Sequence, residues 1–386
     1  MKGRNDMKGK HSMNDRKIFV DNIRWVTVIL VLLYHVLLMY NGLGIEIGCG
    51  RITDLKVQYY DSYMYFVYPW FMPILFIVAG MSSRYYLEKH SVKEFIKSRT
   101  TKLLVPVTIG LFVFQFIQGY VSMALGDAFD NMTNVPMLVK YFIMALSGIG
   151  VLWFIQLLWI YSLILVLIRK LEKGRLLKVG EKTPIWLIIL FCIPVWASSL
   201  IMNTPVITVY RISFYLLFYI LGYYIFSNEK VIEKLKRLAV PFILAGTVIC
   251  IAFTVFYFVI KDMANFADAP VNRTFFYAAA AYFGSLAMLA GFAKYFDFST
   301  GFTLWMSKRS FGLYMFHYLG ISTVALIFGK TGILPAVPVY IISLVAGFVF
   351  GYGLYEIISR IPFFRWAVLG ISRKKKVEDS GTCHRE

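Results

Sequence analysis

Apolar stretches of about 20 residues recur along almost the whole chain and are separated by short polar connections. A helix of roughly 20 apolar residues is long enough to cross the hydrocarbon core of a bilayer. The stretches that reach this length, with soft edges, are residues 18–40, 62–83, 103–125, 151–169, 184–202, 207–227, 237–260, 272–295, 310–328 and 334–358. This pattern predicts an all-α polytopic membrane protein with about ten transmembrane helices.

The composition supports this interpretation and argues against a soluble protein. Of the 386 residues, 59% are hydrophobic, 18% are aromatic and only 16% are charged. A soluble protein with several buried core helices would not contain so many apolar runs of spanning length. We therefore expect most of the chain to lie within the lipid bilayer.

The basic residues, which give the chain a formal net charge of +19, alternate along the connections. Connections rich in Lys and Arg follow every second predicted span, and both ends of the chain are basic as well. The positive-inside rule assigns such segments to the cytoplasm, so the pattern predicts an even number of spans with both termini cytoplasmic. The predicted organisation is a basic N-terminus at 1–17, a ten-helix membrane domain at 18–358 and a basic cytoplasmic tail at 359–386.

The charge and the cysteines do not indicate nucleic acid or metal as a partner. No DNA-binding motif or basic, aromatic groove accompanies the positive charge, so we expect no nucleic acid. The four cysteines are widely scattered and lack the spacing of a zinc site or a disulfide framework, so we expect no metal.

Few ionisable side chains lie inside the predicted spans, and two of them share the first span. Arg24 and His35 are eleven residues apart, which places them on nearly the same helix face, separated by about 16 Å along the axis. Such groups are costly in a membrane and usually mark function. A helix–helix hydrogen bond is the purely structural alternative for His35, and hydrogen bonding shared with nearby tyrosines is the alternative for His317.

Carboxylates are absent from the middle of the predicted spans. A proton- or sodium-coupled transporter usually needs a buried carboxylate or broken helices in matched halves, and a glycoside hydrolase needs a carboxylate pair. A histidine is therefore the best candidate for a general base, because a neutral imidazole in a partly dry cavity can take a proton from a hydroxyl.

The spacing of Asp21, Arg24 and His35 resembles the first-helix signature of the integral-membrane acyltransferase-3 family. Four further stretches agree in the expected order: FIVAGMSSRYYL at 76–87; Phe95, Arg99, Lys102 and Pro106; Leu152, Trp153 and Phe154; and Ser310, Tyr314 and His317. The resemblance extends from about residue 18 to 358, and the layout looks most like the glucan-modifying, succinyl-transferring branch.

One position departs from the family pattern. Lys102 stands where the family's second arginine is expected. Lysine keeps the positive charge but lacks the bidentate fork of arginine, so a contact to a phosphate would survive while a geometrically demanding contact would weaken. Ordinary positive-inside charge is the alternative interpretation of both Arg99 and Lys102.

The resemblance implies an O-acyltransferase in a bacterial cytoplasmic membrane. It would move a short acyl group, such as acetyl or succinyl, from acyl-CoA as co-substrate, with no bound cofactor, to a hydroxyl of an envelope carbohydrate or related acceptor. On the motif, His35 is the general base, Arg24, Arg99 and Lys102 bind the donor, and the supporting residues are Asp21, Arg24, Trp153, Tyr314 and His317.

Two other functions are compatible with ten spans. A transporter or flippase of a lipid-linked glycan or small metabolite is one, because an embedded arginine is also found in permeases. A sensory or scaffold protein is the other, although no connection between the predicted spans is long enough for a large extramembrane domain.

Overall fold

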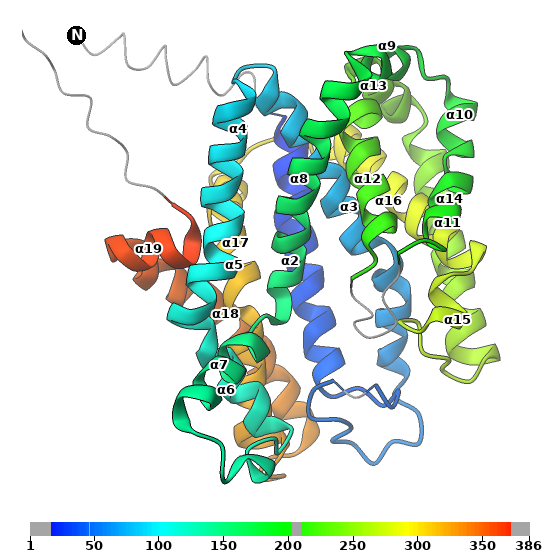
Figure 1. Ribbon diagram of the computed structural model, residues 1–386. Helices are drawn as coiled ribbons and strands as arrows, with labels where there is room; N and C mark the ends of the chain where they lie inside the picture. Colours follow the sequence, from blue (N-terminus) through cyan, green and yellow to red (C-terminus); the bar gives the residue numbers. More distant parts are fainter. Residues whose placement is uncertain (1–16, 46, 203–209, 372–386) are drawn as a thin grey trace, which may run out of the picture.

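The computed structural model describes residues 17–45, 47–202 and 210–371, and these residues form helices joined by turns and loops, without a β-sheet (Figure 1). The helices of its first half are α2 (Ile18–Met39), α3 (Ser62–Leu87), α4 (Val92–Arg99), α5 (Val105–Gly110), α6 (Phe116–Leu125), α7 (Met137–Ser147), α8 (Trp153–Glu172) and α9 (Arg175–Lys182). Those of its second half are α10 (Ile185–Leu190), α11 (Cys192–Ser198), α12 (Ile212–Leu221), α13 (Glu229–Arg237), α14 (Ala239–Thr254), α15 (Ala269–Asn272), α16 (Phe275–Tyr295), α17 (Gly301–Val324), α18 (Ala336–Arg360) and α19 (Pro362–Leu369). The prediction of an all-α polytopic membrane fold is confirmed.

Eight helices of the described chain are long and apolar enough to cross a membrane. They correspond to eight of the ten predicted spans. The other two, 184–202 and 207–227, appear as the shorter apolar helices Ile185–Ser198 and Ile212–Phe226. The number of crossings and the side on which each terminus lies therefore stay predictions.

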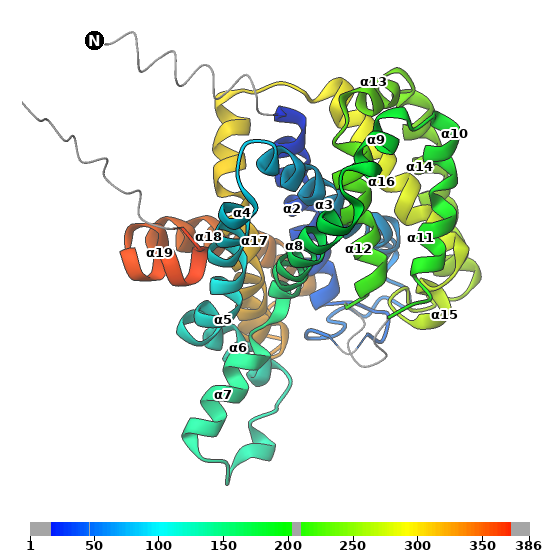
Figure 2. The ribbon, with the colours of Figure 1, turned by 45° about the horizontal axis from the view of Figure 1, so that its top comes forward.

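The two helices α2 and α3 lie at the centre of the bundle. In the views of Figures 1 and 2, α17 and α18 lie on one side of them, and α12, α14 and α16 lie on the other. Helix α3 packs against α2, α12, α14 and α16, and 94% of its most apolar stretch is buried inside the protein. Side chains on α2 and α3 can therefore meet groups from both halves of the chain.

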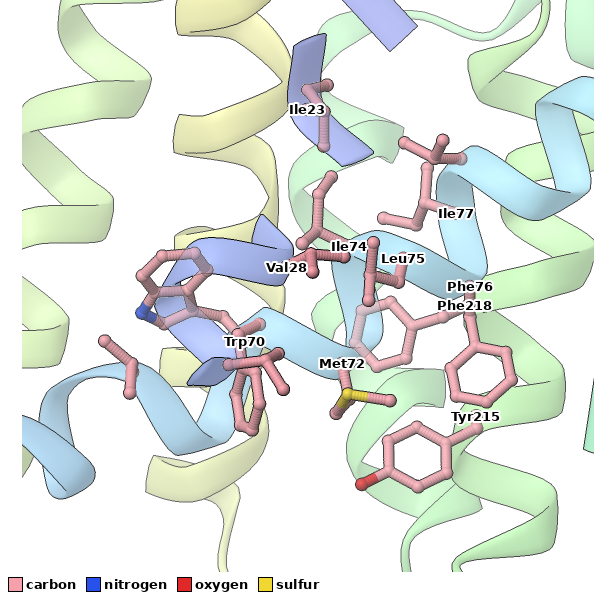
Figure 3. Packing of buried hydrophobic residues seen from close by; sticks show 14 of the residues in the cluster. Ile23, Val28, Trp70, Met72, Ile74, Leu75, Phe76, Ile77, Tyr215 and Phe218 are labelled. Carbon is pink, nitrogen blue, oxygen red and sulfur yellow. The ribbon is translucent and has the colours of Figure 1, made fainter. Parts of the chain in front are cut away.

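Small residues let α3 approach α12 closely. A Cβ atom at Gly80 would lie 2.1 Å from the carbonyl oxygen of Tyr219, and one at Gly222 would lie 2.1 Å from that of Ile77. Around this contact the rings of Phe76 and Tyr215 stack with their centroids 4.8 Å apart (Figure 3). Backbone proximity and ring stacking join the two helices, together with a buried hydrogen bond of 2.7 Å between the hydroxyls of Ser83 on α3 and Tyr219 on α12.

Helix α17 begins at Gly301, nine residues before the start that we expected from hydropathy. Thr300 caps it, because its hydroxyl accepts the backbone N–H of Thr303 while the Thr303 hydroxyl oxygen accepts that of Thr300. The polar residues 307–309 hid this first part of the helix from a reading based on hydropathy. Nine more residues add about 13 Å of helix before residue 310.

Part of the segment assigned to the cytoplasmic tail, 359–386, is an ordered helix. Helix α19 packs against α5, with Ala367, Val368 and Leu369 buried. A Cβ atom at Gly110 would lie 2.6 Å from the carbonyl oxygen of Ala367, so the contact is close. Residues 1–16 of the predicted N-terminus and 372–386 of the predicted tail lie outside the described residues.

Candidate functional site

Two histidines from opposite ends of the chain, the half-buried His35 and the buried His317, meet near the centre of the bundle. His35 lies on α2, four residues before the helix ends, and His317 lies on α17. The distance between His317 Nε2 and His35 Nδ1 is 3.0 Å, and His317 is completely buried. The meeting follows from the packing of α17 directly against α2.

The surroundings of the pair determine where the protons lie in the neutral form. His317 Nδ1 is 2.9 Å from the carbonyl oxygens of both Leu313 and Tyr314, which can only accept, so this nitrogen carries the hydrogen. A neutral imidazole has one N–H, and His317 Nε2 is therefore an acceptor for the Nδ1–H of His35. This assignment leaves the Nε2 atom of His35 with a free lone pair.

His35 faces a cavity of about 680 Å³, which we call the His35 chamber. Aromatic side chains form a large part of its wall, among them Tyr34, Tyr68, Trp153, Tyr215 and Tyr314. The loop residues Gly44, Ile45 and Ile47 and the loop segment 265–268 also border it. The chamber therefore combines one base, several hydroxyls and flat apolar surfaces.

Two of the predicted supporting residues shape this wall. Trp153 begins α8 and packs against Tyr215 with a centroid distance of 5.5 Å. The Tyr314 hydroxyl donates to the backbone carbonyl of Val151, which ties α17 to the start of α8. His35, Trp153, Tyr314 and His317, predicted from separate motifs, are thus brought together.

The predicted donor-binding arginines lie at the other end of α2, around two neighbouring serines of α3. Arg24 forms an ion pair with Asp21 at 2.6 Å and donates to the Ser82 hydroxyl. Arg99 donates to the Ser83 hydroxyl at 2.8 Å. Asp21, Arg24 and Arg99 therefore gather where α2, α3 and α4 meet.

Lys102 is positioned differently from the two arginines. Its side chain is exposed, on the turn of π-helix that follows α4. Its backbone is covered by the end of α19, since a Cβ at Gly370 would lie 2.7 Å from the Lys102 Cα. Lys102 therefore contributes charge at an exposed position next to the cluster.

Two further arginines extend this positive region, and sequence reasoning gave neither a specific role. The guanidinium carbons of Arg84 and Arg169 lie 6.0 and 5.9 Å from the ring centroid of Tyr223. Both residues count as ordinary basic residues under the positive-inside rule, which hid their convergence. Only the pairing of α3 with α8 and α12 brings them to one ring.

Sequence reasoning also left Arg211 without a role, at the outer end of its predicted span. The structure buries this side chain to 1% exposure, between Phe214 and Tyr277. Its position in a predicted span was the available signal, because ionisable groups inside membranes usually mark function.

Comparison with known proteins gives one match. A family model described as an acyltransferase domain matches residues 17–356. Neither the curated proteins nor the solved structures contain a significant match. Within the described residues, no group of three or more His, Cys, Asp or Glu side chains is arranged to hold a metal ion.

Proposed function

The match over residues 17–356 shows that the chain belongs to the integral-membrane acyltransferase-3 family, and from that membership we propose a reaction and a mechanism. The protein is a membrane acyltransferase rather than a transporter or scaffold. We propose that it moves a short acyl group, such as acetyl or succinyl, from cytoplasmic acyl-CoA to a hydroxyl of an envelope carbohydrate or related acceptor. The proposed location is a bacterial cytoplasmic membrane, and the succinyl-transferring branch stays a prediction.

The observation that carries the mechanism is the pair formed by His35 and His317. The hydrogen bond of 3.0 Å between them leaves His35 Nε2 as an acceptor facing the chamber. An imidazole oriented in this way suits general-base catalysis, which contributes about 10²–10⁴-fold to a rate. His317 has a positioning role in this mechanism, because it holds the tautomer and orientation of His35.

The proposed chemistry is a direct transfer of the acyl group from the sulfur of CoA, which is the leaving group, to the oxygen of the acceptor hydroxyl, which is the nucleophile. The acceptor hydroxyl gives its proton to His35 Nε2 as its oxygen bonds to the thioester carbonyl carbon. The carbon–sulfur bond then breaks, and the CoA sulfur takes the proton from the His35 imidazolium. The products are the ester and free CoA, and His35 returns to its neutral form.

The arginine cluster supports acyl-CoA as the donor. CoA carries phosphate groups, which bind hydrogen-bond donors and positive charge. These are supplied near the start of α2 and the ends of α3, α4 and α8 by Arg24, Arg84, Arg99 and Arg169. Asp21 orients Arg24 through their ion pair, and the exposed Lys102 adds charge to the same region. The separation of about 16 Å between Arg24 and His35 along α2 suits a long pantetheine arm.

The aromatic wall supports a carbohydrate acceptor. Aromatic rings offer flat apolar faces, while tyrosine hydroxyls can exchange hydrogen bonds with a polyhydroxylated molecule. The chamber's volume of about 680 Å³ has room for a small acceptor unit beside an acyl group. Trp153 and Tyr314 then line the acceptor's side of the reaction centre.

Substitution of the proposed base is the direct test. His35→Ala, purified in nanodiscs, should catalyse acyl transfer at least a hundredfold more slowly than the wild type. The transfer is measured as the release of CoA and as the mass gain of envelope glycans. Retention of the thermal unfolding midpoint would show that the loss is chemical. Near-normal transfer by the folded variant would refute His35 as the base.

A further inference from the structure

Arg211 is a buried cation at the N-terminus of α12, and its position raises the question of what neutralises it. The side chain is 1% exposed. Its guanidinium carbon lies 3.9 Å from the ring centroid of Phe214 and 4.5 Å from that of Tyr277. Cation–π contacts of this kind offset part of the cost of burying the charge, but they leave its hydrogen-bond donors to be satisfied.

Most of those donors have no acceptor within the described part of the chain. Arg211 Nη2 donates to the backbone carbonyl of Asn272 at 2.7 Å, whereas Nε and Nη1 are buried without a well-aligned acceptor among the described residues, although the hydroxyls of Tyr215 and Tyr277 lie beside the guanidinium. Within the same described residues, the neighbouring Asn272 Oδ1 and the Tyr277 hydroxyl are also buried without a well-aligned partner. Several unsatisfied polar atoms in one place are rare in a protein interior, and such atoms usually bind a ligand, an ion or ordered water.

This cluster lies behind the wall of the His35 chamber and does not itself line the cavity. Two residues of the chamber wall, Tyr68 and Tyr215, lie close enough to Arg211 to interact with its charge. Tyr277 reaches Tyr68 as well, with a ring-centroid distance of 6.3 Å. A group attached to a substrate in the chamber would therefore meet the cluster behind these two tyrosines.

We propose that Arg211, with Tyr277 and the N-terminus of α12, forms an anion subsite of the chamber that binds a carboxylate or phosphate carried by the substrate. The guanidinium supplies charge and donors, the N-terminus of α12 adds the positive end of its helix dipole, and the Tyr277 hydroxyl supplies a further donor. Asp268 also borders the chamber, but it is exposed at the mouth. Which substrate carries the bound anionic group rests on the proposed function. The group belongs either to the acyl donor, as part of its acyl group, or to the acceptor.

Binding of simple anions tests the subsite without turnover. The probes are succinate and inorganic phosphate, added to the full chain in nanodiscs at constant ionic strength, with succinamide as the uncharged comparison. We expect a saturable rise of the thermal unfolding midpoint with at least one anion and none with succinamide. The same rise should occur in His35→Ala, so failure of the proposed chemistry would not remove it.

Tyr277→Phe is the decisive variant, because it deletes a hydroxyl that lies beside the Arg211 guanidinium and has no well-aligned hydrogen-bond partner among the described residues. The variant should fold as well as the wild type and bind the anion at least threefold more weakly, and Arg211→Met should abolish the effect. Tyr282→Phe is the matched control on the same helix: its buried hydroxyl donates to the Ile188 carbonyl at 2.6 Å, so the change should lower stability and leave anion binding unaltered. An absent anion effect in the wild type, or an unchanged affinity in Tyr277→Phe, would overturn the subsite.

Two activity comparisons then identify the carrier of the anion. If the acyl group carries it, the preference for succinyl-CoA over butyryl-CoA should fall at least tenfold in Tyr277→Phe or Arg211→Met. If the acceptor carries it, the preference for glucose 1-phosphate over glucose, with acetyl-CoA as donor, should fall instead. Preferences that are equal in wild type and both variants would refute a role of the subsite in substrate selection.

Discussion

At the residue scale, the site depends on which nitrogen of each histidine carries the hydrogen. The two carbonyl oxygens of Leu313 and Tyr314 hold the hydrogen on Nδ1 of His317, and this in turn orients His35. A residue that sets the tautomer of a base affects the chemical step more than substrate binding. The two histidines should therefore behave as a unit in kinetics.

We predict that His317→Ala lowers kcat about a hundredfold or more and changes KM for acyl-CoA little. The double variant His35→Ala/His317→Ala should be no slower than His35→Ala, because groups that act as a unit are not additive. Steady-state CoA release measures both, and His90→Ala, an exposed histidine, is the control. Additive losses in the double variant would show that the two histidines act independently.

The arginine cluster predicts a different kinetic signature. Arg99→Ala removes a hydrogen-bonded guanidinium from the cluster and should raise KM for acyl-CoA roughly tenfold or more while kcat stays close to normal. Arg360→Ala, at an exposed side chain near the end of α18, should leave both parameters unchanged. A fall in kcat with normal KM in Arg99→Ala would place this arginine outside donor binding.

At the element scale, the close approach of α3 and α12 positions the wall of the chamber. Tyr68 and Met72 on α3 and Tyr215 on α12 all border it, so the distance between these helices determines its width. That distance depends on Gly80 and Gly222, whose missing side chains allow backbone contact. Packing of this kind cannot absorb an added methyl group without moving a helix.

We expect Gly80→Ala to destabilise the protein by about 1–3 kcal/mol, because its Cβ would overlap the Tyr219 carbonyl. The lower thermal unfolding midpoint should be accompanied by reduced activity, since α12 carries Tyr215 into the chamber. Gly353→Ala is the matched control, because a Cβ there meets nothing within 4 Å and the residue is likewise helical. Equal midpoints for the two variants would contradict close packing of α3 against α12.

At the scale of the whole molecule, the charge alternation predicts which loops face outward. The connection between α2 and α3 carries Cys49 and belongs to the predicted outer side. Cys49 is half-buried beside Tyr40 and Gly329, and this burial raises the pKa of its thiol. The raised pKa leaves less thiolate at neutral pH, and thiolate is the form that reacts with maleimides.

A membrane-impermeant maleimide should therefore label Cys49 in intact cells, slowly at pH 7 and faster as the pH rises towards 9. Cys49→Ser should remove the signal, because Cys192 and Cys250 are buried and Cys383 lies on the predicted cytoplasmic tail. Labelling that appears only after the cells are opened would reverse the predicted orientation.

The sequence by itself determined the class of fold and most of the site's members. Apolar length and basic connections reflect the bilayer's thickness and charge asymmetry, which act on each segment separately, so they can be read locally. The motifs around His35, Arg99, Trp153 and His317 were found through their resemblance to those of the acyltransferase-3 family. Segments 184–202 and 207–227 and the start of α17 were less well described, because hydropathy does not register short or partly polar helices.

Only the tertiary structure decided how these residues face one another. The contact between His35 and His317 joins positions 282 residues apart, and the convergence of Arg84 and Arg169 on Tyr223 joins three helices. The burial of Arg211, which has no ion-pair partner among the described residues, likewise depends on α12, α15 and α16 packing together. Such pairings are set by the close packing of whole helices, and no local property of the sequence encodes the distance between two of them.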